Sequence, residues 1–501
     1  MRILIAAQYK KILVFLILLM VIVFGGWLRI SGIIENSFAF TYDVGRDMLA
    51  LQQIVVAHKI PLIGQTTGLA GVFYGPWWYY ILTLPFFILS GNPQLIALFL
   101  AIVGVLTILC AYFLGKKING DFLGIIFSSL WSFSSVMIGL SAQIWNPNLI
   151  PLIILIFLYL LYKVTVGSTG KIFLFFGLVM SLIVDLEIVF GMLFLVSSFI
   201  YFIIFHNKKI NKTNILYLFL GIFVIQLPKI FFEFRHNFLM THKIVNTFIT
   251  FSPSQNQRPF LETIFERVTT MTNNFSDTVA NGNNEIGLFV LILCLIFLFI
   301  SYKNAQKIEK VFVDISLTMV VTFLIGLTLF SQAIWSHYLV GMPVFYLLLI
   351  AQSINLFRKK INSVLIPVLF FIFLVWINLN PLQVYRNYQS KLWEGNAAVY
   401  RNQLAVLDYV YKDSKSREFN YLVYTPAVYD YPYQYLFSWY GKQKYGYSPS
   451  SKTSKLLYVI LEPDYEIPTR LKDWLKIREG DGKVVREKLV KGGVLVQTRI
   501  R

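Results

Sequence analysis

The chain has 501 residues, of which 57% are hydrophobic, 17% aromatic and only 14% charged. Soluble domains carry about 25% charged residues, so this composition excludes a soluble fold for most of the chain. The formal net charge is +19, but the basic residues lie in short clusters between apolar runs, which argues against nucleic acid as a partner. Both cysteines, Cys110 and Cys294, lie inside apolar runs and predict no disulfide.

The first apolar run follows a basic start and predicts a retained membrane helix over about residues 11–28. No small-residue cleavage site follows it, which argues against a signal peptide. With the N-terminus in the cytoplasm, this helix delivers residues 29–94 to the outer side as a long loop. Within that loop the apolar segment 77–90 is too short for a span, and it predicts a half-buried helix.

Further apolar segments predict the remaining spans and give about eleven transmembrane helices in all. The positive-inside rule then places clusters such as Lys116/Lys117 and Arg358/Lys359/Lys360 in the cytoplasm. The same rule places the loop 233–285, and everything after about residue 380, on the outer side. The expected spans are 95–115, 122–141, 149–164, 172–185, 187–205, 214–232, 286–302, 311–331, 337–356 and 361–379.

Residues 381–501 differ from the membrane domain 1–380, because charges and turn residues return and the apolar runs shorten to strand length. They predict a small α/β domain outside the cytoplasm. The expected strands are Tyr421–Thr425, Leu456–Leu461, Val484–Val490 and Val494–Thr498, and the expected helices are Ala398–Tyr411 and Thr469–Ile477.

Two carboxylates and an arginine lie together in the first outer loop, as Asp43, Arg46 and Asp47. A transfer reaction on a phosphate-linked donor needs one carboxylate as general base and one cation for the phosphate. The alternative is a plain helix start, with Asp43 as the N-cap and the other two residues in the first turn. Asp43 and Asp47 would also supply oxygen ligands for Mg²⁺ or Mn²⁺ if they approached each other.

Other ionisable residues are expected on the same side of the membrane. Such groups at membrane depth either line a water-filled cavity or pair with one another. The tyrosine and tryptophan at the entry to the half-buried helix fit an aromatic belt or a sugar-stacking surface. These candidates are Asp185 and Glu187 at a broken helix pair, Glu233, Arg235 and His236 at the end of a span, His337 at a helix start, and Tyr74 and Trp78.

Several familiar signatures are missing from the sequence. It has no phosphate-binding Gly-x4-Gly-Lys-Ser/Thr loop, no His-Glu-x-x-His helix and no Gly-x-Ser-x-Gly elbow. ATP-driven transport and serine or zinc hydrolysis therefore lose their simplest support. A pair of broken helices in matching halves, which would indicate a secondary transporter, is not found either.

Taken together, these segments resemble the GT-C superfamily of membrane glycosyltransferases, over about residues 10–380. The stretch Asp43-Val44-Gly45-Arg46 resembles the family's Asp-Glu-x-Arg motif, with Val44 in place of the second acid, for which Asp47 would substitute. Further similar segments are Gly75-Pro76-Trp77-Trp78-Tyr79-Tyr80, Trp145-Asn146-Pro147, Glu233-Phe234-Arg235-His236-Asn237-Phe238 and His337-Tyr338-Leu339-x-x-x-Pro343.

The resemblance implies a membrane helix bundle whose outer loops cap a catalytic cavity. It implies transfer of a hexosyl or pentosyl group, with inversion, from a polyprenyl-phosphate donor to a glycan, lipid or protein of the cell envelope, at the outer face of the cytoplasmic membrane. Asp43 and Asp47 would be catalytic. Arg46, Arg235, His236 and His337 would bind the donor phosphate, and Tyr74, Trp78, Asp185, Glu187 and Glu233 would line the cavity.

Two other functions use the same features. A flippase for lipid-linked saccharides would use the same cations and aromatic residues, but it would need access from both sides of the membrane. A noncatalytic assembly protein would need the C-terminal domain and could dispense with Asp43. The concentration of polar candidates on one side favours the enzyme.

Overall fold

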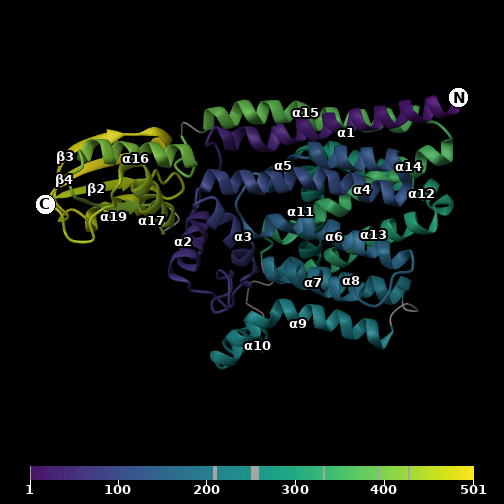
Figure 1. Cartoon of the computed structure of the whole chain (residues 1–501), viewed down its shortest axis with the longest axis horizontal. Coiled ribbons are helices and arrows are strands. Elements are labelled where there is room, and N and C mark those ends of the chain that lie inside the picture. The colour runs from purple at the N-terminus through teal and green to yellow at the C-terminus, as the bar shows by residue number, and fades with distance from the viewer. Residues whose placement is uncertain (1, 207–210, 250–258, 331–332, 393–394, 427–428) are drawn as a thin grey trace.

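The computed structural model describes the chain except for residues 1, 207–210, 250–258, 331–332, 393–394 and 427–428. Most of the described residues form a bundle of helices, and a small domain with a β-sheet lies beyond one end of it (Figure 1). The N-terminus lies at the opposite end of the bundle (Figure 1).

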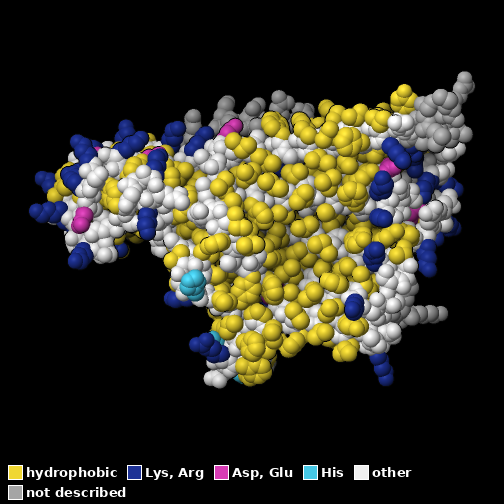
Figure 2. All heavy atoms as spheres, viewed as in Figure 1, with side chains coloured by type: hydrophobic (Ala, Val, Ile, Leu, Met, Phe, Trp, Pro, Cys, Tyr) yellow, Lys and Arg dark blue, Asp and Glu magenta, His cyan; other side chains and the backbone are white. Residues whose placement is uncertain are grey.

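In the described part of the chain, eight helices are long and apolar enough to cross a membrane. Figure 2 shows a broad band of hydrophobic side chains around the bundle, with lysine and arginine gathered beyond it on both sides. The protein is therefore a multi-pass membrane protein, and the expected mainly α fold is confirmed, while the count of eleven spans stays a prediction. The long helices are α1 (Arg2–Ile34), α4 (Pro93–Phe133), α6 (Ile150–Thr165), α8 (Ile188–His206), α9 (Lys212–Arg235), α12 (Asn284–Ser301), α13 (Lys307–Leu329) and α14 (Met342–Ile361).

Three shorter apolar helices accompany them: α3 (Trp77–Ile88), α7 (Ile172–Leu186) and the first part of α15 (Leu365–Leu392). Helix α4 contains the expected span 95–115 and the first part of the expected span 122–141, as two arms that meet at a kink. The kink lies at Asn119 and Gly120, where Gly120 has φ +73°, a conformation that glycine adopts without a steric penalty. A short helix, α5 (Ser135–Ser141), follows the second arm.

The two ends of the bundle differ in what they carry. One end, which we call the basic end, contains Lys116 paired with Asp121 and Lys359 paired with the buried Glu309. The other end, which we call the domain end, contains α2 (Tyr42–Ala57), α3 and the C-terminal sheet domain (Figure 1).

The expected outer loop 233–285 contains two helices, α10 (Leu239–Ile249) and α11 (Phe260–Ala280). Helix α11 packs into the bundle, because its buried Arg267 donates hydrogen bonds to the carbonyls of Leu327 and Phe330 at the end of α13. Short helical turns complete the bundle: η1 (Asn146–Leu149), η3 (Tyr302–Asn304) and η4 (Ser336–Leu339).

The C-terminal domain contains a four-stranded sheet with strand order β1-β2-β4-β3, in which only the β1–β2 pair is parallel. The apolar strand β2 is buried along its whole length, as its position in the middle of the sheet requires. The expected strands and helices are confirmed. They are β1 (Phe419–Tyr424), β2 (Leu456–Leu461), β3 (Lys483–Leu489), β4 (Leu495–Ile500), α16 (Tyr400–Ser414) and α19 (Pro468–Ile477). Four further elements of the domain were not predicted: α17 (Tyr431–Leu436), η5 (Phe437–Gly441), α18 (Lys442–Tyr445) and η6 (Lys491–Gly493).

Candidate functional site

Helix α2 begins after the extended residue Thr41, which occupies the N-cap position without a side-chain cap bond. Asp43 therefore lies in the first turn and is not the N-cap, which corrects one of the two alternatives for this residue. The first turn favours a carboxylate because the helix dipole is positive there. Asp43 accepts a 2.6 Å hydrogen bond from Arg46 Nη1, and 28% of its side chain is exposed.

Arg46 also donates two hydrogen bonds, of 2.9 and 3.0 Å, to Oδ1 of Asp47. Burial opposes the charge of the guanidinium, but Asp47 and Asp43 outweigh this effect and hold the pKa of Arg46 above its ordinary value. Asp47 is fully buried, and it also accepts hydrogen bonds from Trp78 Nε1 at 2.8 Å and Tyr79 OH at 3.2 Å. Its oxygens are enclosed by protein donors, which differs from the prediction that Asp47 shares the chemistry with Asp43.

The same contact corrects the expectation for Trp78. Its side chain is 1% exposed and its indole N–H is used by Asp47, so it lies in the core between α2 and α3 and offers no face to a sugar. Tyr74 is different. Its hydroxyl donates a 3.0 Å hydrogen bond to Oε2 of Glu187.

Glu187 lies at the break between α7 and α8, where the chain becomes extended for one residue. Its side chain is almost completely buried, and Nε2 of His337 lies 4.0 Å from Oε2. Burial and the neighbouring Glu187 carboxylate raise the pKa of Tyr74, so the phenol remains a proton donor to Glu187. Glu187, Tyr74 and His337 thus form one cluster from three distant parts of the chain.

The Asp43 carboxylate lies within electrostatic range of both Tyr74 and His337, and Tyr338 lies within the same range of Glu187. The structure therefore brings together five polar side chains at the domain end of the bundle. Two of them, Asp43 and Glu187, are carboxylates.

Asp185 lies beside this cluster but has a structural environment of its own. Its carboxylate pairs with Lys229 at 3.1 Å and accepts a hydrogen bond from the Trp77 backbone N–H at 3.2 Å, at the start of α3. A Cβ at position 75 would overlap this carboxylate, so only glycine at this position lets the loop lie so close to Asp185. Asp185 therefore fixes the loop that carries Tyr74.

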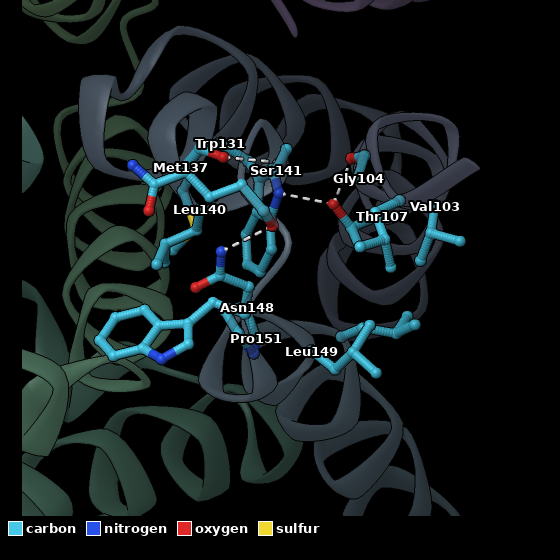
Figure 3. Close-up of a pocket in the computed structure, with 14 residues that line it drawn as sticks. Val103, Gly104, Thr107, Trp131, Met137, Leu140, Ser141, Asn148, Leu149 and Pro151 are labelled. Carbon is cyan, nitrogen blue, oxygen red and sulfur yellow. Dashed lines mark hydrogen bonds between the residues drawn. The ribbon is translucent and has the colours of Figure 1, made fainter. Parts of the chain in front are cut away.

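A small cavity of about 30 Å³ lies between α4, α5 and the start of α6 (Figure 3). Thr107, Trp131, Ser141 and Asn148 are among its lining residues, and Trp131 Nε1 donates a 2.8 Å hydrogen bond to Thr107. Trp145 also lines it, and the Trp145 ring packs edge to face on the His337 ring at 5.4 Å. Trp145 thus separates this cavity from the polar cluster, and the cavity has room for one or two water molecules.

Glu233, Arg235 and His236 lie at the end of α9. Glu233 accepts hydrogen bonds from the Met240 and Thr241 backbone N–H groups at 2.9 Å, so it caps α10. Arg235 and His236 are exposed, and the His236 ring stacks on Phe232 at 4.1 Å. The structure does not show these three residues in contact with the described cluster around Asp43.

Two residues of the site region were not among the candidates: Tyr338 and Gln65. Gln65 is 6% exposed, and neither its Oε1 nor its Nε2 has a hydrogen-bond partner among the described residues. It lies opposite Tyr74 in a short antiparallel ladder, since Tyr74 N–H donates to the Gln65 carbonyl at 2.9 Å. Residues directly opposite each other project to the same face, so Gln65 lies beside the phenol of Tyr74.

The described residues contain no group of three or more histidine, cysteine or acidic side chains placed to hold a metal ion. The candidate pair Asp43 and Asp47 does not fit a divalent cation, because Arg46 lies between the two carboxylates and pairs with both. A cation there would have to displace the guanidinium.

No protein-family model matches the chain, and no curated protein matches its sequence. The structure is similar to that of ArnT from Cupriavidus metallidurans bound to undecaprenyl phosphate, with a TM-score of 0.57, 10% identity and 98% of each chain covered. At this identity the likeness establishes a shared fold, which agrees with the expected membrane helix bundle and small C-terminal domain.

Two structures of an archaeal oligosaccharyltransferase from Archaeoglobus fulgidus are also similar. One is a complex with Zn and sulfate, has a TM-score of 0.47 and 14% identity, and covers 74% of this chain and 52% of that chain. The other, AglB with an inhibitory peptide and a dolichol-phosphate, has a TM-score of 0.47 and 12% identity, and covers 91% of this chain and 70% of that chain. The fold assignment comes from the ArnT structure.

Proposed function

We propose that the protein is a glycosyltransferase that transfers a sugar from a polyprenyl-phosphate donor to an acceptor of the cell envelope. The observation that carries this proposal is the partly exposed Asp43–Arg46 pair, which lies within electrostatic range of Tyr74 and His337, the two neighbours of the buried Glu187. The fold supports it, because the ArnT structure with the same fold over 98% of both chains was solved with undecaprenyl phosphate bound.

The charge distribution supports a site on the outer face of the cytoplasmic membrane. The basic end carries Lys116, Lys359 and the neighbouring basic residues, and the positive-inside rule assigns such an end to the cytoplasm. The N-terminus is then cytoplasmic, and the C-terminal domain and the site are extracytoplasmic. A donor whose lipid tail stays in the bilayer presents its phosphate and sugar at the depth of this site, so no nucleotide is needed.

In this mechanism Asp43 is the general base. The acceptor hydroxyl displaces Arg46 from one carboxylate oxygen, gives its proton to Asp43 and attacks the anomeric carbon as the bond to the phosphate oxygen breaks. One displacement inverts the configuration of the sugar. Asp43 is suited to this role because, of Asp43 and Asp47, it is the one with an exposed side chain.

Arg46 and His337 are proposed to stabilise the leaving phosphate. The bonds to Asp43 and Asp47 use three of the five N–H groups of Arg46. Asp47 contributes indirectly, because its hydrogen bonds hold the guanidinium of Arg46 in place. Arg235 and His236, exposed at the end of α9, are proposed to attract the anionic headgroup at longer range.

The test is transfer of radiolabelled sugar from polyprenyl-phosphate donors to membrane extract, by the protein reconstituted in lipid vesicles. Wild type is expected to transfer from at least one donor, and Asp43→Asn is expected to lose about 10³-fold in kcat. Asp473→Asn, at an exposed position of α19 in the C-terminal domain, is the matched control. Movement of the labelled lipid between leaflets without transfer, and equally in Asp43→Asn, would instead identify a flippase.

A further inference from the structure

The C-terminal domain is joined to the linker between α1 and α2 by backbone hydrogen bonds. Phe40 N–H donates to the Ala398 carbonyl at 2.8 Å, and Tyr400 N–H donates to the Phe38 carbonyl at 3.1 Å. Phe40 is fully buried, and its ring packs against that of Tyr400 at 5.4 Å. Residues 38–40, just before α2, are therefore held against residues 398–400 by an isolated antiparallel bridge between Ala39 and Val399.

A second contact is made directly on α2. Helix α17 packs against α2 at Gly45, and a Cβ at this position would overlap the backbone of Tyr431 and Pro432. Backbone atoms cannot move aside as a flexible side chain does, so any larger residue at position 45 must separate the two helices. Gly45 lies two residues from Asp43 and one from Arg46.

A third contact ties the domain to the turn between α3 and α4. Tyr435 OH donates a hydrogen bond to the Gly91 carbonyl, and Trp439 Nε1 donates to the Ser90 carbonyl at 2.8 Å. Helix α3 in turn holds the other side of α2, through the bonds of Trp78 and Tyr79 to Asp47. Helix α2 is thus held between α3 and α17. Helix α17 belongs to the C-terminal domain, and the domain also contacts the turn that follows α3.

We infer that the C-terminal domain is a positioning element for α2 and that Gly45 is the positioning residue through which it acts. This inference rests on the proposed function, because its consequence is the placement of Asp43 and Arg46 against the bound donor. A displacement of about 1 Å at a reacting group costs on the order of 10²-fold in rate. The domain would thereby affect catalysis without touching the substrate.

The experiment compares Gly45→Ala with Gly68→Ala, a control in the same outer loop whose added Cβ meets no atom within 4 Å. Two quantities are measured for each protein in lipid nanodiscs. The first is the kcat and KM for the polyprenyl-phosphate donor. The second is the hydrogen exchange of peptides from α2 and from α14. Trp439→Phe, which removes the bond to Ser90 without adding bulk, is the second variant if Gly45→Ala folds poorly.

Gly45→Ala is expected to lower kcat by about 30-fold, while KM changes by less than about threefold, and to increase exchange in α2 but not in α14. Trp439→Phe is expected to shift both quantities in the same direction by smaller amounts, and Gly68→Ala is expected to shift neither. A kcat within about twofold of wild type in Gly45→Ala would overturn the inference, whatever the exchange shows. If wild type transfers no sugar while α2 exchange still rises in Gly45→Ala, the proposed function fails and the hold of the domain on α2 stands.

Discussion

Buried carboxylates lie at both ends of the bundle, and the two ends satisfy them differently. At the basic end, Glu309 is fully buried and accepts hydrogen bonds from Lys359 Nζ at 2.8 Å, Asn355 at 3.1 Å, the Gln306 backbone N–H at 2.8 Å, and Asn119. One carboxylate thus joins α4, α13 and α14. All of its donors are protein groups held in place by helices.

At the domain end, two of the carboxylates, Asp43 and Glu187, have fewer hydrogen-bond donors than Glu309 has. Asp47 and Asp185 are satisfied like Glu309, whereas Asp43 has 28% of its side chain exposed and shares its cation with Asp47. Glu187 has a phenol and a backbone N–H as donors, and a histidine at 4.0 Å. A network that is complete serves stability, and one that is left open has capacity for a ligand.

The largest effect is expected from breaking the complete network. Glu309→Ala leaves the Lys359 ammonium and two amides without their acceptor, and loss of one partner of a buried pair costs about 3 to 5 kcal/mol. The free energy of unfolding in mixed micelles is expected to fall by that amount, with little change in the kcat of the folded protein. Glu285→Ala, on the exposed first turn of α12, is the control. Equal losses in the two variants would contradict the account.

A buried carboxylate outside the bundle sharpens the comparison, because no cation pairs with it among the described residues. Glu462, in the C-terminal domain, is 7% exposed, and burial raises its pKa to about 7. The folded state binds the proton of Glu462 more tightly than the unfolded chain does. The contribution of this group to the free energy of unfolding is therefore greatest below pH 4.5 and falls by about 3 kcal/mol as the pH rises to 7. Glu462→Gln is expected to remove this loss between pH 5 and pH 8. An unchanged pH dependence of unfolding would show that another group is responsible.

The open network is tested by Glu187→Gln. The amide keeps the shape of the side chain but removes the charge beside Tyr74 and His337, and kcat for sugar transfer is expected to fall by about 10²-fold. The apparent melting temperature should stay within about 2 °C of wild type. Tyr74→Phe, which removes only the hydroxyl, should lose about tenfold. A melting temperature as low as that of Glu309→Ala would place Glu187 among the structural carboxylates.

The smallest effect is expected at Arg235, which lies outside both networks. Because its side chain is exposed at the end of α9, Arg235→Gln should change kcat by less than about threefold. The effect should appear mainly in KM for the donor and should vanish at high salt, as long-range attraction of a headgroup does. A loss as large as that of Glu187→Gln would show that Arg235 contacts the phosphate.

The sequence was sufficient for features that depend on neighbouring residues. Long apolar runs predicted the membrane helices, and apolar runs of strand length predicted β2 and the other strands of the C-terminal domain. The Asp43–Arg46 pair was also within reach, because residues three apart lie on one face of a helix.

Features that depend on contacts between distant residues could not be predicted from the sequence. The burial of Asp47 results from Trp78 on another helix, and Glu233 is removed from the candidate cavity by the cap that it forms on α10. Gln65 carries no local signal, since its position is set by its pairing with Tyr74, and the partner of Lys229 is the distant Asp185. The close approach of Gly45 to Pro432 needed the folded C-terminal domain.

The most direct test of the account measures kcat and thermal stability together in Asp43→Asn and Glu309→Gln. The account predicts that Asp43→Asn loses about 10³-fold in transfer and keeps its melting temperature. It also predicts that Glu309→Gln loses several degrees in melting temperature and keeps its kcat. Full transfer activity in Asp43→Asn would contradict the central claim that this carboxylate at the open end of the bundle performs the chemistry.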